Sequence, residues 1–111
     1  MEEAIQKKGN RLMVTIPGEL DHHYAEQIKG VVDKQLENGS IRSVVFDFRN
    51  TTFMDSSGIG MIMGRYRLLS YMGGSVAAIH VSDRIMRIMQ LSGIHKFIEI
   101  SQETVWNQKR K

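Results

Sequence analysis

The chain has 111 residues and a mass of 12.7 kDa, which suits one compact domain and leaves no room for a second core. Its hydrophobic fraction of 41% and charged fraction of 24% are ordinary for a folded globular protein, so disorder and fibrous repeats are not expected. The formal net charge of +3 is small and depends partly on the closing basic run Lys109 to Lys111, which argues against nucleic-acid binding.

The composition also limits the chemistry. The absence of cysteine excludes disulfides, thiol catalysis and cysteine-based zinc sites. The start of the chain is charged and lacks the apolar stretch of a secretory signal, and no segment approaches the roughly 20 apolar residues of a membrane span. We therefore expect a cytoplasmic protein that binds neither nucleic acid nor membrane.

The first predicted unit is a β-hairpin formed by residues 4–8 and 11–16. Gly9 and Asn10 lie between the two segments and suit a tight turn. Apolar residues alternate along the second segment, so one face of that strand should point to the core: Leu12, Val14 and Ile16.

A helix is predicted to follow from Asp21 to the Asn38-Gly39 pair. Asp21 suits the N-cap position, because its side chain can accept from a free N–H of the first turn, and Gly39 suits the end. Apolar residues fall on a single helical stripe: Ala25, Ile28, Val32 and Leu36.

Residues 44–48 form an apolar run typical of a strand that is buried on both faces, interrupted only by Asp47. An ionised carboxylate in such a strand is costly unless it accepts hydrogen bonds. We expect Asp47 to hold the neighbouring loop through backbone N–H groups, with a catalytic role ranked behind that structural one.

The remainder alternates helices with strands. A helix is predicted from about residue 55 to Gly73, a strand over residues 75–80, a helix between Ser82 and Gly93, and a short strand over residues 97–100. The residues predicted to face inward from the two helices are Ile59, Ile62, Met63, Tyr66 and Leu69, then Ile85, Ile88, Met89 and Leu91. Residues 101–111 should form a short polar helix, anchored by Trp106, and a basic tail.

This order predicts a single α/β domain over residues 1–111 with its core at about 4–100. Strands that alternate with helices imply crossover connections and a mainly parallel sheet packed against helices. The opening hairpin adds one antiparallel strand, which makes the sheet mixed.

The most unusual segment is residues 53–60, FMDSSGIG, which places an acid, two hydroxyls and two glycines where a loop enters a helix. Helix N-termini present free N–H groups and a partial positive charge, so an added anion would be favoured there. An ordinary capping segment is the commoner explanation of such residues. Dinucleotide, P-loop and nucleophile-elbow motifs all fail on the spacing of their glycines.

The histidines and methionines indicate no bound metal or cofactor. His22 and His23 are adjacent and diverge by about 100° on a helix, so they cannot share one metal ion. His80 and His95 are isolated in the sequence. The methionines at helical spacing are expected to fill the core: Met61, Met63, Met86 and Met89.

Four segments together carry a resemblance to a known family: residues 18–23, 53–60 and 64–66, and the glycine pair 73–74. They resemble the anti-sigma factor antagonists of the STAS domain family, and most closely the sporulation antagonists that act on the anti-sigma F factor. The resemblance spans about residues 5–100. It implies a STAS-type fold and a regulator of transcription that is not an enzyme.

The resemblance also implies a partner-switching cycle. The unphosphorylated antagonist binds an anti-sigma factor, which is also a serine kinase, and so frees the sigma factor; phosphorylation of Ser56 ends this binding and a serine phosphatase restores it. ATP and Mg²⁺ belong to the kinase, so no cofactor is expected on this chain. The implied partner-binding residues are Glu19, Asp21, His22, Asp55, Ser57, Gly58 and Ile59.

A phosphate brings about −1.5 to −2 charges. On Ser56 it would meet the positive end of a helix, so the domain should tolerate it. The loss of binding is therefore expected at the interface, through bulk, desolvation and repulsion, without refolding.

Three alternatives remain open. The chain is also compatible with the STAS antagonist of a general stress-response module or the STAS subunit of a lipid transporter. A small hydrolase or phosphotransfer enzyme that uses Asp47 or Asp55 with Ser56 would belong to another class, but no histidine is spaced to act as its base.

Overall fold

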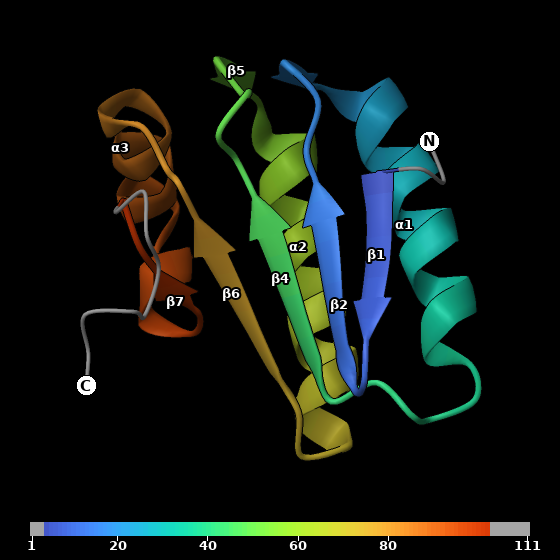
Figure 1. Cartoon of the computed structure of the whole chain (residues 1–111). Helices are drawn as coiled ribbons and strands as arrows, with labels where there is room; N and C mark the ends of the chain where they lie inside the picture. The colour runs from blue at the N-terminus through green and yellow to red at the C-terminus, as the bar shows by residue number, and fades with distance from the viewer. Residues whose placement is uncertain (1–3, 103–111) are drawn as a thin grey trace.

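The computed structural model describes residues 4–102 of the chain. Its main sheet has five strands in the order β1-β2-β4-β6-β7 (Figure 1). The antiparallel hairpin of β1 and β2 opens the sheet, and every other neighbouring pair is parallel, which confirms the predicted mixed topology. The strand bounds are β1 Ile5–Lys8, β2 Arg11–Thr15, β4 Ser43–Asp47, β6 Ser75–Ile79 and β7 Glu99–Ile100.

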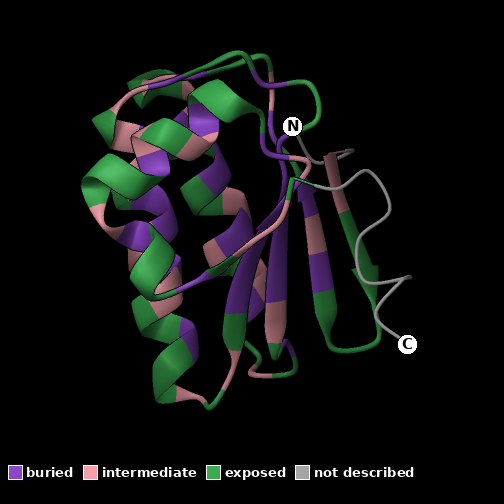
Figure 2. Cartoon of the chain, turned by 90° about the vertical axis from the view of Figure 1, so that its left-hand side faces the viewer, coloured by how far each residue is buried: buried purple, intermediate pink, exposed green. Residues whose placement is uncertain are grey.

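The helices gather on one side of this sheet (Figure 2). Helix α1 comprises His22–Leu36, α2 comprises Ser56–Tyr71 and α3 comprises Asp83–Ser92, followed by the short 3-10 helix η2 at Ile94–Lys96. The predicted stops are confirmed at Gly39, Gly73 and Gly93, where positive φ values of 76°, 76° and 84° end or follow the helices. Since the strands are joined by helical crossovers, the start of each helix follows the carboxyl end of a strand.

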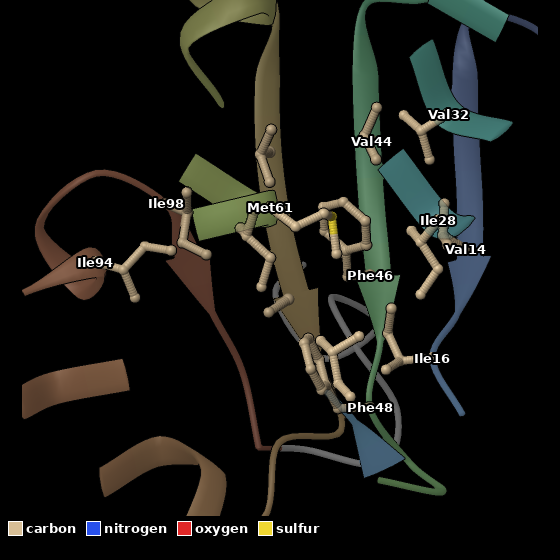
Figure 3. Packing of buried hydrophobic residues seen from close by; sticks show 14 of the residues in the cluster. Val14, Ile16, Ile28, Val32, Val44, Phe46, Phe48, Met61, Ile94 and Ile98 are labelled. Carbon is tan, nitrogen blue, oxygen red and sulfur yellow. The ribbon is translucent and has the colours of Figure 1, made fainter. Parts of the chain in front are cut away.

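The core lies between the sheet and the helices (Figure 3). Phe46 and Phe48, from β4 and the residue after it, are almost wholly buried at its centre. The predicted stripe of α1 is buried, and Met61 and Met89 fill the core as predicted, with Met63 and Met86 partly buried against it. A smaller cluster occupies the opposite face of the sheet: Val45, Ala77 and Ile79, with Met13 against it.

Two predictions about helix α3 and the last strand are wrong. Leu91 is 82% exposed, because about 100° per residue places it roughly 120° around the helix from the buried Ile85. The last strand begins at Glu99 instead of residue 97, since residues 94–96 form η2 first. The predicted C-terminal helix with Trp106 falls mainly on residues 103–111, which lie outside the described residues, and Ser101 and Gln102 are not helical.

Asp47 holds the loop after β4, as predicted. Its Oδ1 accepts from the backbone N–H of Arg49 at 3.0 Å. The structure also brings His80, which the sequence left isolated, to within 2.9 Å of the same oxygen through Nδ1. His80 has a positive φ of 57°. Its contact with Asp47, which lies 33 positions earlier in the chain, links the ends of β4 and β6.

Candidate functional site

A two-stranded parallel ribbon that the sequence did not predict lies before helices α1 and α2. Its strands are β3, Glu19–Leu20, and β5, Phe53–Met54, seen at the top of Figure 1. Leu20 and Met54 are buried, whereas Glu19 and Phe53, paired across the ribbon, are exposed. The ribbon continues into a backbone hydrogen bond of 3.2 Å from Asp55 N to Leu20 O.

The ribbon starts the two helices side by side, so both N-termini lie at one edge of the sheet. Asp21 caps α1, with Oδ1 accepting from Tyr24 N at 3.1 Å, and Asp55 caps α2, with Oδ1 accepting from Ser57 N at 2.9 Å. Both caps have extended backbones. Two positive helix ends therefore meet at this edge, each capped by a carboxylate.

Gly58 allows α2 to approach the ribbon. A Cβ atom at this position would lie 2.7 Å from Met54 Cγ and 2.8 Å from Leu20 Cδ2, which is too close for a real side chain. Gly58 is also buried. Its placement explains a glycine here through packing, and the implied contact between Gly58 and a partner stays a prediction.

The two serines of α2 differ in exposure. Ser56 is exposed at the first helical position, and within residues 4–102 no hydrogen bond engages its hydroxyl. Ser57 is half-buried and lines a groove between α1 and α2. Because Asp55 supplies the cap, the hydroxyl of Ser56 is available at the surface for modification.

The groove has a volume of about 290 Å³ and lies between α1 and α2. Its lining residues are His22, Ala25, Glu26, Lys29, Ser57, Gly60, Met61, Gly64 and Arg65. Arg65 is only 5% exposed and forms an ion pair across the helices, with 2.9 Å between its Nε and Asp33 Oδ1, although the N–H is not aligned for a hydrogen bond. Sequence reasoning did not predict that this arginine is buried, although its charge falls on the inward stripe of α2.

The other implied contact residues occupy the same edge with different exposure. Glu19 and His22 are exposed, and Asp21 and Asp55 are partly buried by their capping bonds. Ile59 packs partly against the core. The structure adds Phe53, which is 46% exposed on the ribbon and was not among the predicted contacts.

Residues 4–102 contain no group of three or more His, Asp or Glu side chains placed to hold a metal ion. Within the same range, no helix combines the length and apolar character needed to cross a bilayer.

The sequence profile of the STAS domain family matches residues 3–105 of this chain. The anti-sigma F factor antagonist of Paenibacillus polymyxa is 36% identical over 89 residues, which cover 80% of this chain and 76% of the relative. The anti-sigma-B factor antagonist of Bacillus subtilis is 26% identical over 97 residues, which cover 87% of each chain.

Two solved structures of the Bacillus protein SpoIIAA have the same fold as this chain. The unphosphorylated form of this anti-sigma factor antagonist superposes with a TM-score of 0.74 at 27% identity, covering 91% of this chain and 90% of that one. The phosphorylated form gives a TM-score of 0.73 at 28% identity, covering 89% and 90%. The matched fold is thus the same in both states.

Proposed function

Because the chain belongs to the STAS domain family, we propose that it is an anti-sigma factor antagonist controlled by phosphorylation of Ser56. Its unphosphorylated form binds an anti-sigma factor that is also a serine kinase, and this binding releases a sigma factor for transcription. A serine phosphatase returns the phosphorylated chain to its active form. The curated relatives named as anti-sigma F factor antagonists support the sporulation type of this function.

The observation that carries the proposal is the free hydroxyl of Ser56. Ser56 is exposed at the first position of α2, and Asp55 satisfies the helix cap with its carboxylate. A kinase can therefore modify Ser56 without breaking a hydrogen bond of the fold. Ser57 is a poorer acceptor, since it is half-buried against the groove.

The electrostatics of the helix end explain how one phosphate switches binding without refolding the domain. The phosphate adds about −1.5 to −2 charges next to free N–H groups and the positive end of α2. Beside Asp55 and Glu19, the same charge creates an acidic, strongly hydrated patch. A partner that docks on this edge must desolvate that patch, which opposes binding.

The contact surface in this proposal is the shared edge of the two helix starts. Glu19 and His22 offer exposed charged or polar groups, while Asp21, Asp55 and Ser57 offer partly buried ones. Ile59 is partly buried at this surface and packs against the core. We propose that Glu19 and Asp21 pair with basic residues of the kinase.

The remaining parts of the proposal follow from this role. The chain acts by binding and not by catalysis, and the ATP and Mg²⁺ of the cycle are held by the kinase. The protein works in the cytoplasm, where its partners are the anti-sigma factor kinase and a serine phosphatase.

A second candidate function is the equivalent antagonist of a general stress-response module. It is favoured by the 26% identity to the anti-sigma-B factor antagonist of Bacillus subtilis, which extends over more of the chain than the match to the Paenibacillus protein. The two functions differ in the kinase that the chain binds.

Incubation with ATP and each anti-sigma factor encoded in the same genome tests both candidates. We expect one factor to transfer a single phosphate, mass spectrometry to locate it on Ser56, and Ser56→Ala to abolish transfer. Ser57→Ala is the matched control and should still accept phosphate. If no anti-sigma factor transfers phosphate to this chain, or if the phosphate is found on Ser57 alone, the proposal is wrong.

A further inference from the structure

The outward face of the β3-β5 ribbon places an aromatic ring beside the proposed phosphorylation site. Phe53 precedes Ser56 by three residues and is 46% exposed. Its neighbour Met54 points inward and is 3% exposed, as strand alternation requires. The ribbon therefore fixes Phe53 outward because Leu20 and Met54 occupy the inward face.

Phe53 differs in position from the other large exposed apolar side chains of residues 4–102. These are Leu68, Tyr71, Leu91 and Phe97. Leu68 and Tyr71 lie in the last turns of α2, Leu91 lies near the end of α3, and Phe97 follows η2. Only Phe53 precedes the first turn of α2, so within the described chain it is the large apolar side chain exposed at the Ser56 edge.

Phe53 lies within the reach of a kinase that docks over Ser56. Three residues of extended chain span at most about 10 Å, so the Cα atoms of Phe53 and Ser56 cannot be further apart than this. A specific protein interface is much wider, since it buries about 800 Å² on each partner. The ring is therefore close enough to Ser56 to fall inside the contact when Ser56 enters the active site of a folded kinase.

The surroundings of the ring indicate the chemistry of its binding pocket. Glu19 lies directly across the ribbon and is exposed, and Asp55 is two residues along the chain. Aromatic anchors surrounded by charged rim residues are typical of the energetic centres of protein interfaces. The pocket that accepts this ring should be apolar and flanked by basic side chains.

We propose that Phe53 is the apolar anchor by which this chain docks on its anti-sigma factor kinase, in an apolar, basic-rimmed pocket next to the kinase active site. The inference rests on the proposed function and adds to it an apolar contact residue at this edge. Phosphorylation of Ser56 then acts three residues from the anchor and prevents the ring from being desolvated.

The experiment is calorimetric titration of the unphosphorylated chain with the anti-sigma factor of the same genome that phosphorylates it. We expect Phe53→Ala to weaken binding by at least about tenfold, as the loss of a buried aromatic contact requires. Tyr71→Ala is the matched control, because Tyr71 is an aromatic residue that is 92% exposed and lies in the last turn of α2, at the opposite end of the helix from the ribbon. It should bind within about threefold of the parent chain, a change of less than about 1 kcal/mol.

Two further variants separate the anchor from a merely structural role. Phe53→Thr removes the ring but keeps the strand preference of the ribbon, and Phe53→Leu keeps an apolar side chain. We expect Phe53→Thr to lose binding as Phe53→Ala does, Phe53→Leu to retain most of it, and all variants to keep the melting temperature of the parent chain.

The outcomes are distinguishable. If the parent chain binds a kinase and Phe53→Ala and Phe53→Thr bind equally well, the anchor is disproved while the proposed function stands. If the parent chain binds no anti-sigma factor, the proposed function fails and the inference fails with it. If sedimentation shows that the ring instead joins two copies of this chain, the assigned occupant is wrong.

Discussion

Helices α2 and α3 begin with the same two residue types in opposite order, and the order decides which side chain is left free. In α2, Asp55 is the cap and Ser56 is the first helical residue; in α3, Ser82 is the cap and Asp83 is the first helical residue. The hydroxyl of Ser82 is occupied, since its Oγ accepts from Ile85 N at 3.2 Å. The hydroxyl of Ser56 is exposed because a carboxylate does the capping in α2.

The comparison shows why one serine at a helix start is suited to a switch and another is not. A cap hydroxyl is part of the fold, so its modification disturbs a hydrogen bond that holds the first turn. A hydroxyl one position later lies beside the same free N–H groups without being needed by them. The positive end of the helix then accepts a phosphate at little cost to stability.

The third helical position gives a second contrast. It is Gly58 in α2, under the β3-β5 ribbon, and Ile85 in α3, fully buried in the core. Helix α3 uses a large side chain to anchor its start, whereas α2 gives up that side chain so that the ribbon can lie against it. The ribbon in turn aligns α2 with α1 and creates the shared edge.

The largest expected effect concerns phosphate at the two ends of α2. Phosphoserine encoded at position 56 should weaken binding to the anti-sigma factor at least about a hundredfold, or about 2.7 kcal/mol, while the melting temperature stays equal or rises. Phosphoserine at the exposed Ser70, in the last turn, should leave binding unchanged and lower the melting temperature, because its charge meets the negative helix end.

Calorimetry measures binding, and circular dichroism measures the melting temperature, for the parent chain and for the chains with phosphoserine at position 56 or 70. A phosphate at Ser56 that lowers stability as much as one at Ser70 would contradict the separation between docking and folding.

The next effect concerns the packing of α2 under the ribbon. Gly58→Ala should destabilise the protein by about 1–3 kcal/mol, because the new methyl group meets Met54 and Leu20. Gly60→Ala, in the same helix with open space around its Cβ position, should stabilise by up to about 1 kcal/mol. Urea unfolding measures both. If both substitutions change the free energy of unfolding equally, the close approach of the ribbon is not the reason for glycine at position 58.

A smaller effect on stability is expected from removing the side chains that begin α2 and α3. Asp55→Ala and Ser82→Ala should each cost about 1 kcal/mol of unfolding free energy through loss of a cap. Ser56→Ala should change stability by less than about 0.5 kcal/mol, as for an exposed side chain without a structural bond. Thermal unfolding of the three variants provides the measurement, and a cost at Ser56 equal to that at Ser82 would refute the contrast.

Most of the fold was predictable because its signals are local. The hairpin turn at Gly9, the caps Asp21 and Ser82, and the inward stripe of α1 are all encoded within a few neighbouring residues. Leu91 was mistaken for a core residue because an apolar side chain near the end of a helix resembles a continuation of its stripe, although the geometry turns it outward.

The ribbon and the Asp47-His80 contact could not be predicted in the same way. Strands of two residues carry no periodicity, and β3 and β5 are joined by backbone hydrogen bonds between segments more than 30 positions apart. His80 reaches Asp47 only because β4 and β6 are neighbours in the sheet. The exposure of Phe53 could not be predicted for the same reason. The alternation of side chains along a strand gives the direction of Phe53 only once β5 is known.

The smallest expected effect separates capping from charge at the start of α1. Asp21→Asn keeps a side-chain oxygen that can accept from Tyr24 N and so should alter stability by less than about 0.5 kcal/mol, whereas Asp21→Ala loses the cap and about 1 kcal/mol. If Asp21 also pairs with a basic group of the kinase, Asp21→Asn should slow association by about threefold at low salt, and the difference should vanish at high salt. Stopped-flow binding at two ionic strengths measures this. Identical association rates at low salt would leave Asp21 as a cap alone, and the acidic contribution at this edge would then come from Glu19, whose carboxylate caps no helix.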